Sequence, residues 1–91
     1  FETVGNIETL KFIQQQAKQR PEDLNIAKFM GEVQKLLGDN EGAAKSWERA
    51  VELLVRKGER SQASALLRQM IVLKSRQEKR YRTMLDHLTK Q

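Results

Sequence analysis

The sequence predicts an all-α fold, in which antiparallel helical hairpins stack as a short α-solenoid of about five helices. Its composition favours helix, because Ala, Leu, Lys, Glu, Gln and Arg dominate the 91 residues while Pro occurs once and Gly five times. Apolar residues recur every three or four positions, which is the period of a helix that buries one face. The stretches between these stripes are very short, so consecutive helices must lie antiparallel against each other.

The first helix is expected over residues 6–19, with Asn6 as its N-cap. Its stripe consists of Ile7, Leu10, Ile13, Gln14 and Ala17. Pro21 should end this helix, because a proline disfavours the α conformation at the preceding Arg20. The same proline is expected to open the second helix in its first turn, where Glu22 and Asp23 suit the helix dipole.

The second helix should end at Gly38, because glycine adopts the left-handed conformation of a helix C-terminus at little cost. One side of this helix is formed by Leu24, Ala27, Met30, Gly31, Gln34 and Leu37. Asp39 or Asn40 is expected to cap the third helix, which runs to Lys57 before Gly58 ends it in the same way.

The fourth helix is expected over residues 60–73, and a basic terminal helix over residues 75–90. Ser75-Arg76-Gln77-Glu78 has the pattern of a capping box at the start of that last helix. Its apolar stripe consists of Tyr81, Met84, Leu85 and Leu88.

Two stretches, residues 37–53 and 57–73, resemble each other at a spacing of twenty positions. The matching pairs are Gly38/Gly58, Asp39/Glu59, Ala43/Ala63, Val51/Ile71 and Leu53/Leu73. Each turn between two helices needs the same residues, so we interpret the echo as one helix used twice. Residues 40–57 close one hairpin and open the next.

Close packing of such helices requires small residues where they cross. Small residues are present at Gly31, Ala43, Ala50 and Ala63. Trp47 lies about one helical turn from both Ala43 and Ala50, so its ring is expected to fill the groove that these residues leave. Core packing is therefore the predicted role of Trp47.

The spacing over residues 24–53 resembles a tetratricopeptide repeat (TPR), a family of paired helices. The positions that carry the resemblance are Gly31, Gly38-Asp39, Ala43, Trp47 and Ala50. Two features depart from the family pattern. Val55 stands where the closing proline is usual, and a shift of 34 residues carries Gly38 onto Val72 instead of another turn glycine.

The predicted organisation is thus a single TPR-like helical domain over residues 1–91. Residues 24–53 give the best repeat match, residues 57–73 form a degenerate half-repeat with turn residue Gly58 and packing residue Ala63, and residues 75–90 form the terminal helix. Because the chain begins with Phe1 and not with Met, we expect it to be part of a longer protein.

The resemblance implies a protein-binding role, in which the first helix of each pair lines a concave surface for a peptide or a helix. By position, that surface would contain Asn25, Lys28, Glu32 and Lys35. The clamp that some family members use for a C-terminal carboxylate cannot be assembled here, and Glu32 would oppose it.

Charge is distributed unevenly along the chain. Residues 1–55 carry seven Lys/Arg and nine Asp/Glu, a net of −2, whereas residues 56–91 carry ten and three, a net of +7. The densest basic run consists of Lys74, Arg76, Lys79, Arg80 and Arg82. This run is interpreted either as a solvated helix face or as a contact for an acidic protein, a nucleic-acid backbone or an anionic membrane. Tyr81 is the one aromatic residue nearby, so a base-stacking platform is not expected.

Enzyme chemistry is not expected from this sequence. There is no Cys, no zinc-protease pattern and no glycine-rich phosphate loop, and the single His87 is interpreted as a solvated residue. We therefore expect neither a cofactor nor a metal ion. The acids should pair with cations along their own helices, as in Glu41/Lys45 and Glu48/Glu52/Arg56.

No membrane span is expected either, because the longest apolar run, residues 70–73, is far shorter than the roughly twenty residues that a span needs. No secretory signal is visible, and a cytoplasmic location is the expectation. Phe12 and Phe29 lie off the main stripes, so second-face packing and an exposed partner contact both stay open for them. The run Gln14-Gln15-Gln16 is interpreted as ordinary helix surface.

The predicted function is a non-catalytic protein–protein interaction module, an adaptor, scaffold or regulatory domain that binds a partner peptide or helix. One alternative is binding of nucleic acid or another acidic surface through the basic C-terminal helix. Another is a homodimer, because a short solenoid without dedicated caps leaves apolar edges at its ends.

Overall fold

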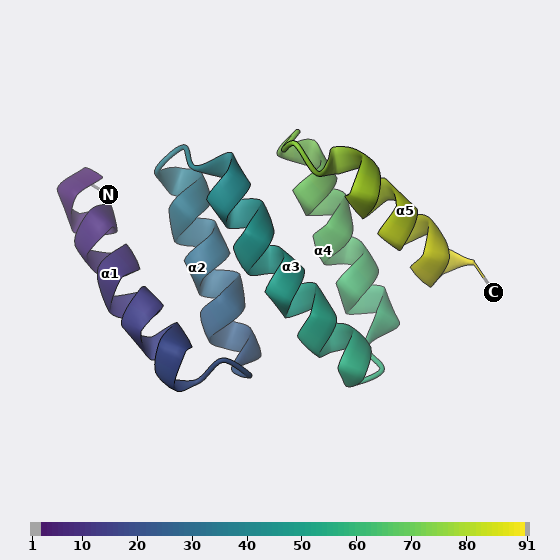
Figure 1. Ribbon diagram of the computed structural model, residues 1–91, viewed down its shortest axis with the longest axis horizontal. Helices are drawn as coiled ribbons and strands as arrows, with labels where there is room; N and C mark the ends of the chain where they lie inside the picture. The colour runs from purple at the N-terminus through teal and green to yellow at the C-terminus, as the bar shows by residue number, and fades with distance from the viewer. Residues whose placement is uncertain (1–2, 91) are drawn as a thin grey trace.

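The computed structural model describes residues 3–90, and this part of the chain is all-α, as predicted (Figure 1). Its five helices are α1 (Thr3–Gln19), α2 (Leu24–Leu36), α3 (Asn40–Arg56), α4 (Arg60–Val72) and α5 (Glu78–Thr89). Residues 3–90 contain no strand.

The helices are stacked in sequence order, with the two ends of the chain at opposite ends of the stack (Figure 1). Within the described residues, close backbone packing joins each helix to the helices that precede and follow it, and α2 with α3 forms the most extensive pair. In Figure 1, α3 and α5 lie in front of α2 and α4. The stack measures 44 × 26 × 17 Å, an elongated shape that follows from nearest-neighbour packing.

The two turn glycines behave as predicted. Gly38 has φ +82° and Gly58 has φ +78°, so both occupy the left-handed region after a helix C-terminus. The amides of Gly38 and Asp39 donate to the carbonyls of Lys35 (3.0 Å) and Gln34 (2.9 Å), and the turn at Gly58 repeats this Schellman pattern. Asp39 then caps α3, because its carboxylate accepts from the Gly42 amide at 2.9 Å.

A third left-handed turn residue, Lys74, could not be recognised from the glycine pattern. Lys74 has φ +53° and follows Leu73, the C-cap of α4, as Gly38 and Gly58 follow the C-caps of α2 and α3. Its amide donates to the Ile71 carbonyl at 3.1 Å, the same bond that Gly38 makes. Lys74 therefore belongs to the basic run and is also the third turn residue of the stack.

We expect Lys74→Gly to raise the free energy of unfolding by about 0.5–1 kcal/mol. A residue with a side chain is strained in the left-handed conformation by about 1–2 kcal/mol, and glycine removes this strain. The flexibility of glycine in the unfolded chain offsets part of the gain. Urea denaturation followed by circular dichroism measures the change. Arg68→Gly is the control, since the same exchange inside a helix should cost about 1 kcal/mol. A loss of stability in Lys74→Gly would contradict the prediction.

The predicted starts of α1 and α2 were wrong. α1 begins at Thr3, so Asn6 lies inside the helix and is not its N-cap. Pro21 and Glu22 lie in a turn, and α2 begins only after Asp23. The Asp23 carboxylate accepts from the amides of residues 25 and 26 at 3.0 and 3.2 Å, so the cap determines where α2 begins, and Pro21 does not.

The start of α5 also differs from the prediction. α5 begins at Glu78, with Gln77 at the N-cap position and without a side-chain cap. The Ser75 hydroxyl accepts from the Gln77 amide at 3.3 Å and not from Glu78, while the Glu78 carboxylate pairs with Arg82. Residues 75–78 therefore form a turn with no capping box, and the terminal helix is shorter than the predicted residues 75–90.

The core contains the predicted crossing residues Ala43, Ala50 and Ala63, but the predicted stripe of α1 lies outside it, since Ile7 is 42% exposed and Gln14 is exposed. Its buried apolar residues are Ala27, Ala43, Ala44, Trp47, Ala50, Val51, Leu54, Ala63, Leu66, Leu67, Met70, Leu73 and Tyr81. Met84, Leu85 and Leu88 of α5 pack against this cluster. A Cβ atom on Gly31 would overlap the Trp47 ring, so the glycine is what lets α2 approach α3.

Candidate functional site

A hollow of about 250 Å³ lies between α2 and α4, and α3 forms its base. It arises because both helices pack on α3 without packing against each other. The buried side chains of Trp47 and Leu54 line it from α3. The residues that α2 and α4 contribute are Lys28, Glu32, Gln62, Ala65, Leu66 and Gln69.

Two of the four predicted binding residues reach this hollow. Lys28 and Glu32 line it, whereas Asn25 and Lys35 are exposed elsewhere on α2. The Trp47 indole donates to the Lys28 carbonyl at 3.0 Å, which fixes the lining of α2 relative to that of α3.

The lining from α4 was missed by the sequence analysis. Gln62, Ala65 and Gln69 lie three and four residues apart on the exposed side of α4, a spacing that the sequence already contained. What the sequence lacked was the information that this side faces α2 across α3. We call this hollow the α2–α4 groove. Its lining combines Lys28 and Glu32, which were predicted to bind a partner, with residues of α4 that were not.

The α2–α4 groove presents chemistry suited to a polypeptide. Glutamine amides carry both donors and an acceptor, so Gln62 and Gln69 match the N–H and C=O groups of a peptide backbone. Lys28 and Glu32 make no ion pair within residues 3–90, so each can meet a charge on a partner. The apolar atoms of Trp47 and Leu54 add a surface for a side chain.

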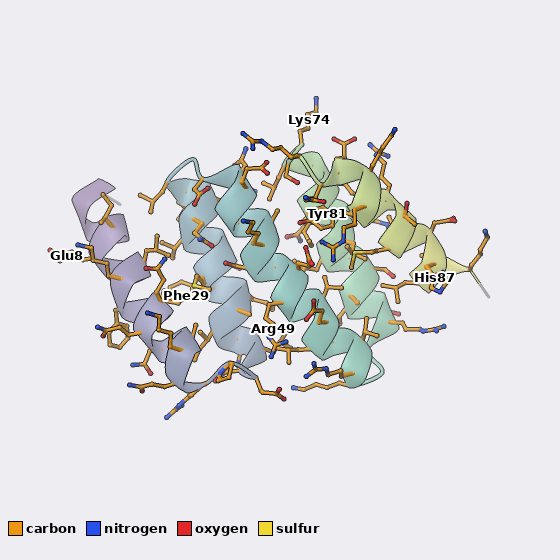
Figure 2. All side chains as sticks on the ribbon, in the orientation of Figure 1. Glu8, Phe29, Arg49, Lys74, Tyr81 and His87 are labelled. Carbon is orange, nitrogen blue, oxygen red and sulfur yellow. The ribbon has the colours of Figure 1, made fainter. Side chains whose placement is uncertain are left out.

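Two members of the basic run are held in ion pairs. Arg80 pairs with Glu48 at 2.8 Å, and Arg82 pairs with Glu78 at 3.0 Å. The other members are Lys74, Arg76 and Lys79, which are exposed and make no ion pair within the described chain. Lys74 projects from the upper end of the stack (Figure 2).

The predicted ion pairs along α3 are not formed, and three of the six ion pairs within residues 3–90 join different segments. Arg56 pairs with Glu22 at 3.2 Å rather than with Glu48 or Glu52, and Arg49 bridges Glu22 at 3.6 Å and Glu52 at 3.2 Å. The pair Glu41/Lys45 is not formed either, since the Glu41 carboxylate accepts from the Arg76 backbone amide at 2.9 Å. These contacts fasten the α1–α2 and α4–α5 turns to α3.

Tyr81 links α5 to α3. Its ring is fully buried, and its hydroxyl donates to the Glu48 carboxylate at 3.1 Å. Burial, followed by the negative charge of Glu48 and the hydrogen bond to it, raises the pKa of Tyr81 from 10.0 to about 12. The phenol therefore keeps its proton where an exposed tyrosine would lose it.

The raised pKa of Tyr81 predicts a loss of stability in alkali. Above pH 10 the unfolded chain releases this proton while the folded chain holds it, so stability falls as the pH rises from 10.0 to about 12. The slope contributed by this group reaches at most about 1.4 kcal/mol per pH unit. Tyr81 is the only tyrosine, so phenolate absorbance follows it alone. Titration of the folded protein with a midpoint near 10 would contradict the prediction, and Tyr81→Phe should remove the slope.

The remaining aromatic residues and His87 have distinct surroundings. Phe12 is 62% exposed and Phe29 is 49% exposed, so second-face packing does not describe either residue. Trp47 is 3% exposed, as its predicted core role requires. His87 is exposed on α5 (Figure 2), yet it borders a second hollow of about 270 Å³ between α3 and α5.

Residues 3–90 contain neither a cluster of metal ligands nor a membrane-spanning helix. No group of three or more His, Asp or Glu side chains in this part of the chain is placed to hold a metal ion. None of the described helices is long and apolar enough to cross a membrane.

Comparisons with known proteins give no relative. No protein-family model, no curated protein and no solved structure matches this chain. Its function is therefore inferred from its own residues.

Proposed function

We propose that this chain is a non-catalytic protein–protein interaction module, a TPR-like adaptor, scaffold or regulatory domain of the cytoplasm, and that its α2–α4 groove holds a partner peptide or helix. The observation that carries the proposal is the preformed hollow of about 250 Å³ between α2 and α4. Its size suits one or two side chains of a partner, and its lining offers apolar, amide and charged groups together.

Binding in this groove would use a rigid base and a charged rim. The Trp47 ring is held by the Lys28 carbonyl and by close packing against Gly31, so little side-chain freedom is lost when a partner docks. Lys28 and Glu32 lie one turn apart on α2 with opposite charges, which would orient a partner more than they would strengthen its binding.

The test is to fill the groove without touching the core. Ala65 is exposed and lines the hollow, so Ala65→Arg should occupy it while leaving the fold intact. Partners captured by the wild-type chain in a crosslinked pull-down are identified by mass spectrometry, and the affinity of each purified partner is measured by calorimetry. We expect Ala65→Arg to weaken binding at least about tenfold, which is the loss of one well-packed contact.

Two matched charge reversals complete the experiment. Lys28→Glu changes the groove, and Lys11→Glu makes the same change at an exposed position on α1, so only the first should weaken binding. Circular dichroism verifies that each variant is folded. Equal affinity of the wild-type and Ala65→Arg chains for every partner would overturn the proposed function.

A further inference from the structure

The second hollow opens between α3 and α5, the two helices that lie in front of α2 and α4 in Figure 1. Its volume is about 270 Å³, and its lining consists of Val51, Val55, Thr83, Met84, His87 and Leu88. Val51 is buried, while Val55 is 43% exposed although it is apolar. This α3–α5 groove shares no lining residue with the α2–α4 groove.

Polar contacts join α3 to α5 beside the groove. Glu48 accepts from the Tyr81 hydroxyl at 3.1 Å and pairs with Arg80 at 2.8 Å. These residues precede Val51 on α3 and Thr83 on α5, so the contacts close the groove toward the N-terminal ends of both helices. Toward the C-terminal ends, the apolar lining is left uncovered.

The charge beside the closed end is not balanced. A shallow polar hollow there is lined by Lys45, Glu48, Arg49, Glu52 and Arg80. Both acids in it are paired with its arginines, and Lys45 makes no ion pair within residues 3–90. Lys45 thus leaves one exposed positive charge, ten residues before Val55, which is roughly 15 Å along α3.

The size of the groove and the chemistry of its lining argue against two other occupants. A stable dimer interface uses about 20–30 residues a side, so the six residues that line this hollow do not by themselves make one. A polar metabolite or ion would find only Thr83 and His87 as polar side chains in the lining, and no Asp, Glu, Lys or Arg. An apolar cavity of about 150 Å³ holds a benzene molecule, so 270 Å³ admits one or two apolar side chains.

We propose that the α3–α5 groove binds an amphipathic helix of a partner protein. The helix inserts one or two apolar side chains between Val55 and Met84 and places a carboxylate against Lys45, about three helical turns away. One apolar anchor in a pocket beside a single charge contact is how small interfaces concentrate their affinity. This second surface lets the domain hold two partners in grooves that share no lining residue.

The probe is a displayed library of random 16-residue peptides, selected on the immobilised full chain at low salt. Enriched peptides are expected to share apolar residues at i and i+4 and an acidic residue about eleven positions away. Binding should fall at least tenfold in Thr83→Arg, which fills the groove from an exposed position, and in Val55→Asp. It should fall several-fold in Lys45→Glu, with a weaker dependence on salt.

The controls separate this site from other surfaces. Val72→Asp makes the same kind of change at a residue that is 74% exposed and outside both grooves, so it should leave binding unchanged. Peptides that ignore Thr83→Arg and Val55→Asp but are lost in Ala65→Arg would overturn this inference while supporting the α2–α4 groove. A dimer seen by light scattering and abolished by Val55→Asp would overturn it too, because a second copy would then occupy the groove.

Discussion

Trp47→Ala should lower the free energy of unfolding by about 3–5 kcal/mol, the usual cost of truncating a buried aromatic ring. Trp47 is 3% exposed, and it packs between the small residues of α2 and α3 while donating to the Lys28 carbonyl at 3.0 Å. Truncation leaves a cavity and also leaves that carbonyl without its donor. A loss of this size is a large part of the total free energy of unfolding of a small domain, so the variant should be close to unfolding at 37 °C.

Urea denaturation followed by circular dichroism measures this change, since Trp47 is the only tryptophan and its fluorescence is lost in the variant. Val72→Ala is the control, because that side chain is 74% exposed and its truncation should change stability by no more than about 0.5 kcal/mol. If both variants unfold at the same urea concentration, Trp47 does not hold α2 against α3.

Gly31→Ala should cost about 2 kcal/mol, even though alanine favours a helix interior by about 1 kcal/mol over glycine. The added methyl group would overlap the Trp47 ring, and the ring is held by its hydrogen bond and by the surrounding core. The two helices must therefore move apart or the ring must leave its rotamer.

A double-mutant cycle separates this overlap from other effects of the methyl group. In a Trp47→Phe background the smaller ring leaves room, so Gly31→Ala should cost much less or become stabilising. Urea midpoints of the four proteins give the coupling free energy. An equal cost of Gly31→Ala in both backgrounds would show that the Trp47 ring is not what requires a glycine.

The fold was largely predictable, because its determinants are local. The turns at Gly38 and Gly58 depend on the residue itself, and the Asp39 cap depends on an amide three residues away. Lys74 was missed because a lysine does not itself favour the left-handed conformation that it adopts here. Pro21 misled for a related reason, since the nearby Asp23 carboxylate offered the stronger start signal.

The candidate sites were less predictable, because they depend on contacts between distant residues. Helical periodicity showed that Lys28 and Glu32 share a face, but only the packing of α2 and α4 on α3 brings Gln62 and Gln69 opposite them. Ion pairs were mispredicted in the same way. A pattern of i and i+4 charges finds pairs within one helix, whereas Arg56 binds Glu22 thirty-four residues away.

Buried polar groups were also missed. Gln34 and Ser46 form a hydrogen bond of 2.5 Å between α2 and α3, both of them buried in the interface. Gln34 was predicted on the packing side of α2, but nothing in the sequence marks Ser46 as its partner. Because a polar atom buried without a partner is costly, such a pair restricts the register in which α2 and α3 can pack.

Close backbone packing in residues 3–90 occurs at four interfaces between consecutive helices, and the contacts of Tyr81 and Arg80 with Glu48 add a side-chain link between α5 and α3. Stability in such an arrangement is a sum of local terms, so an opening at one end need not propagate to the other. Fraying of α5 from α4 would abolish the α3–α5 groove and leave the α2–α4 groove whole. Loss of α1 would spare both. Substitutions in the terminal helix could accordingly alter the α3–α5 groove without disturbing the α2–α4 groove.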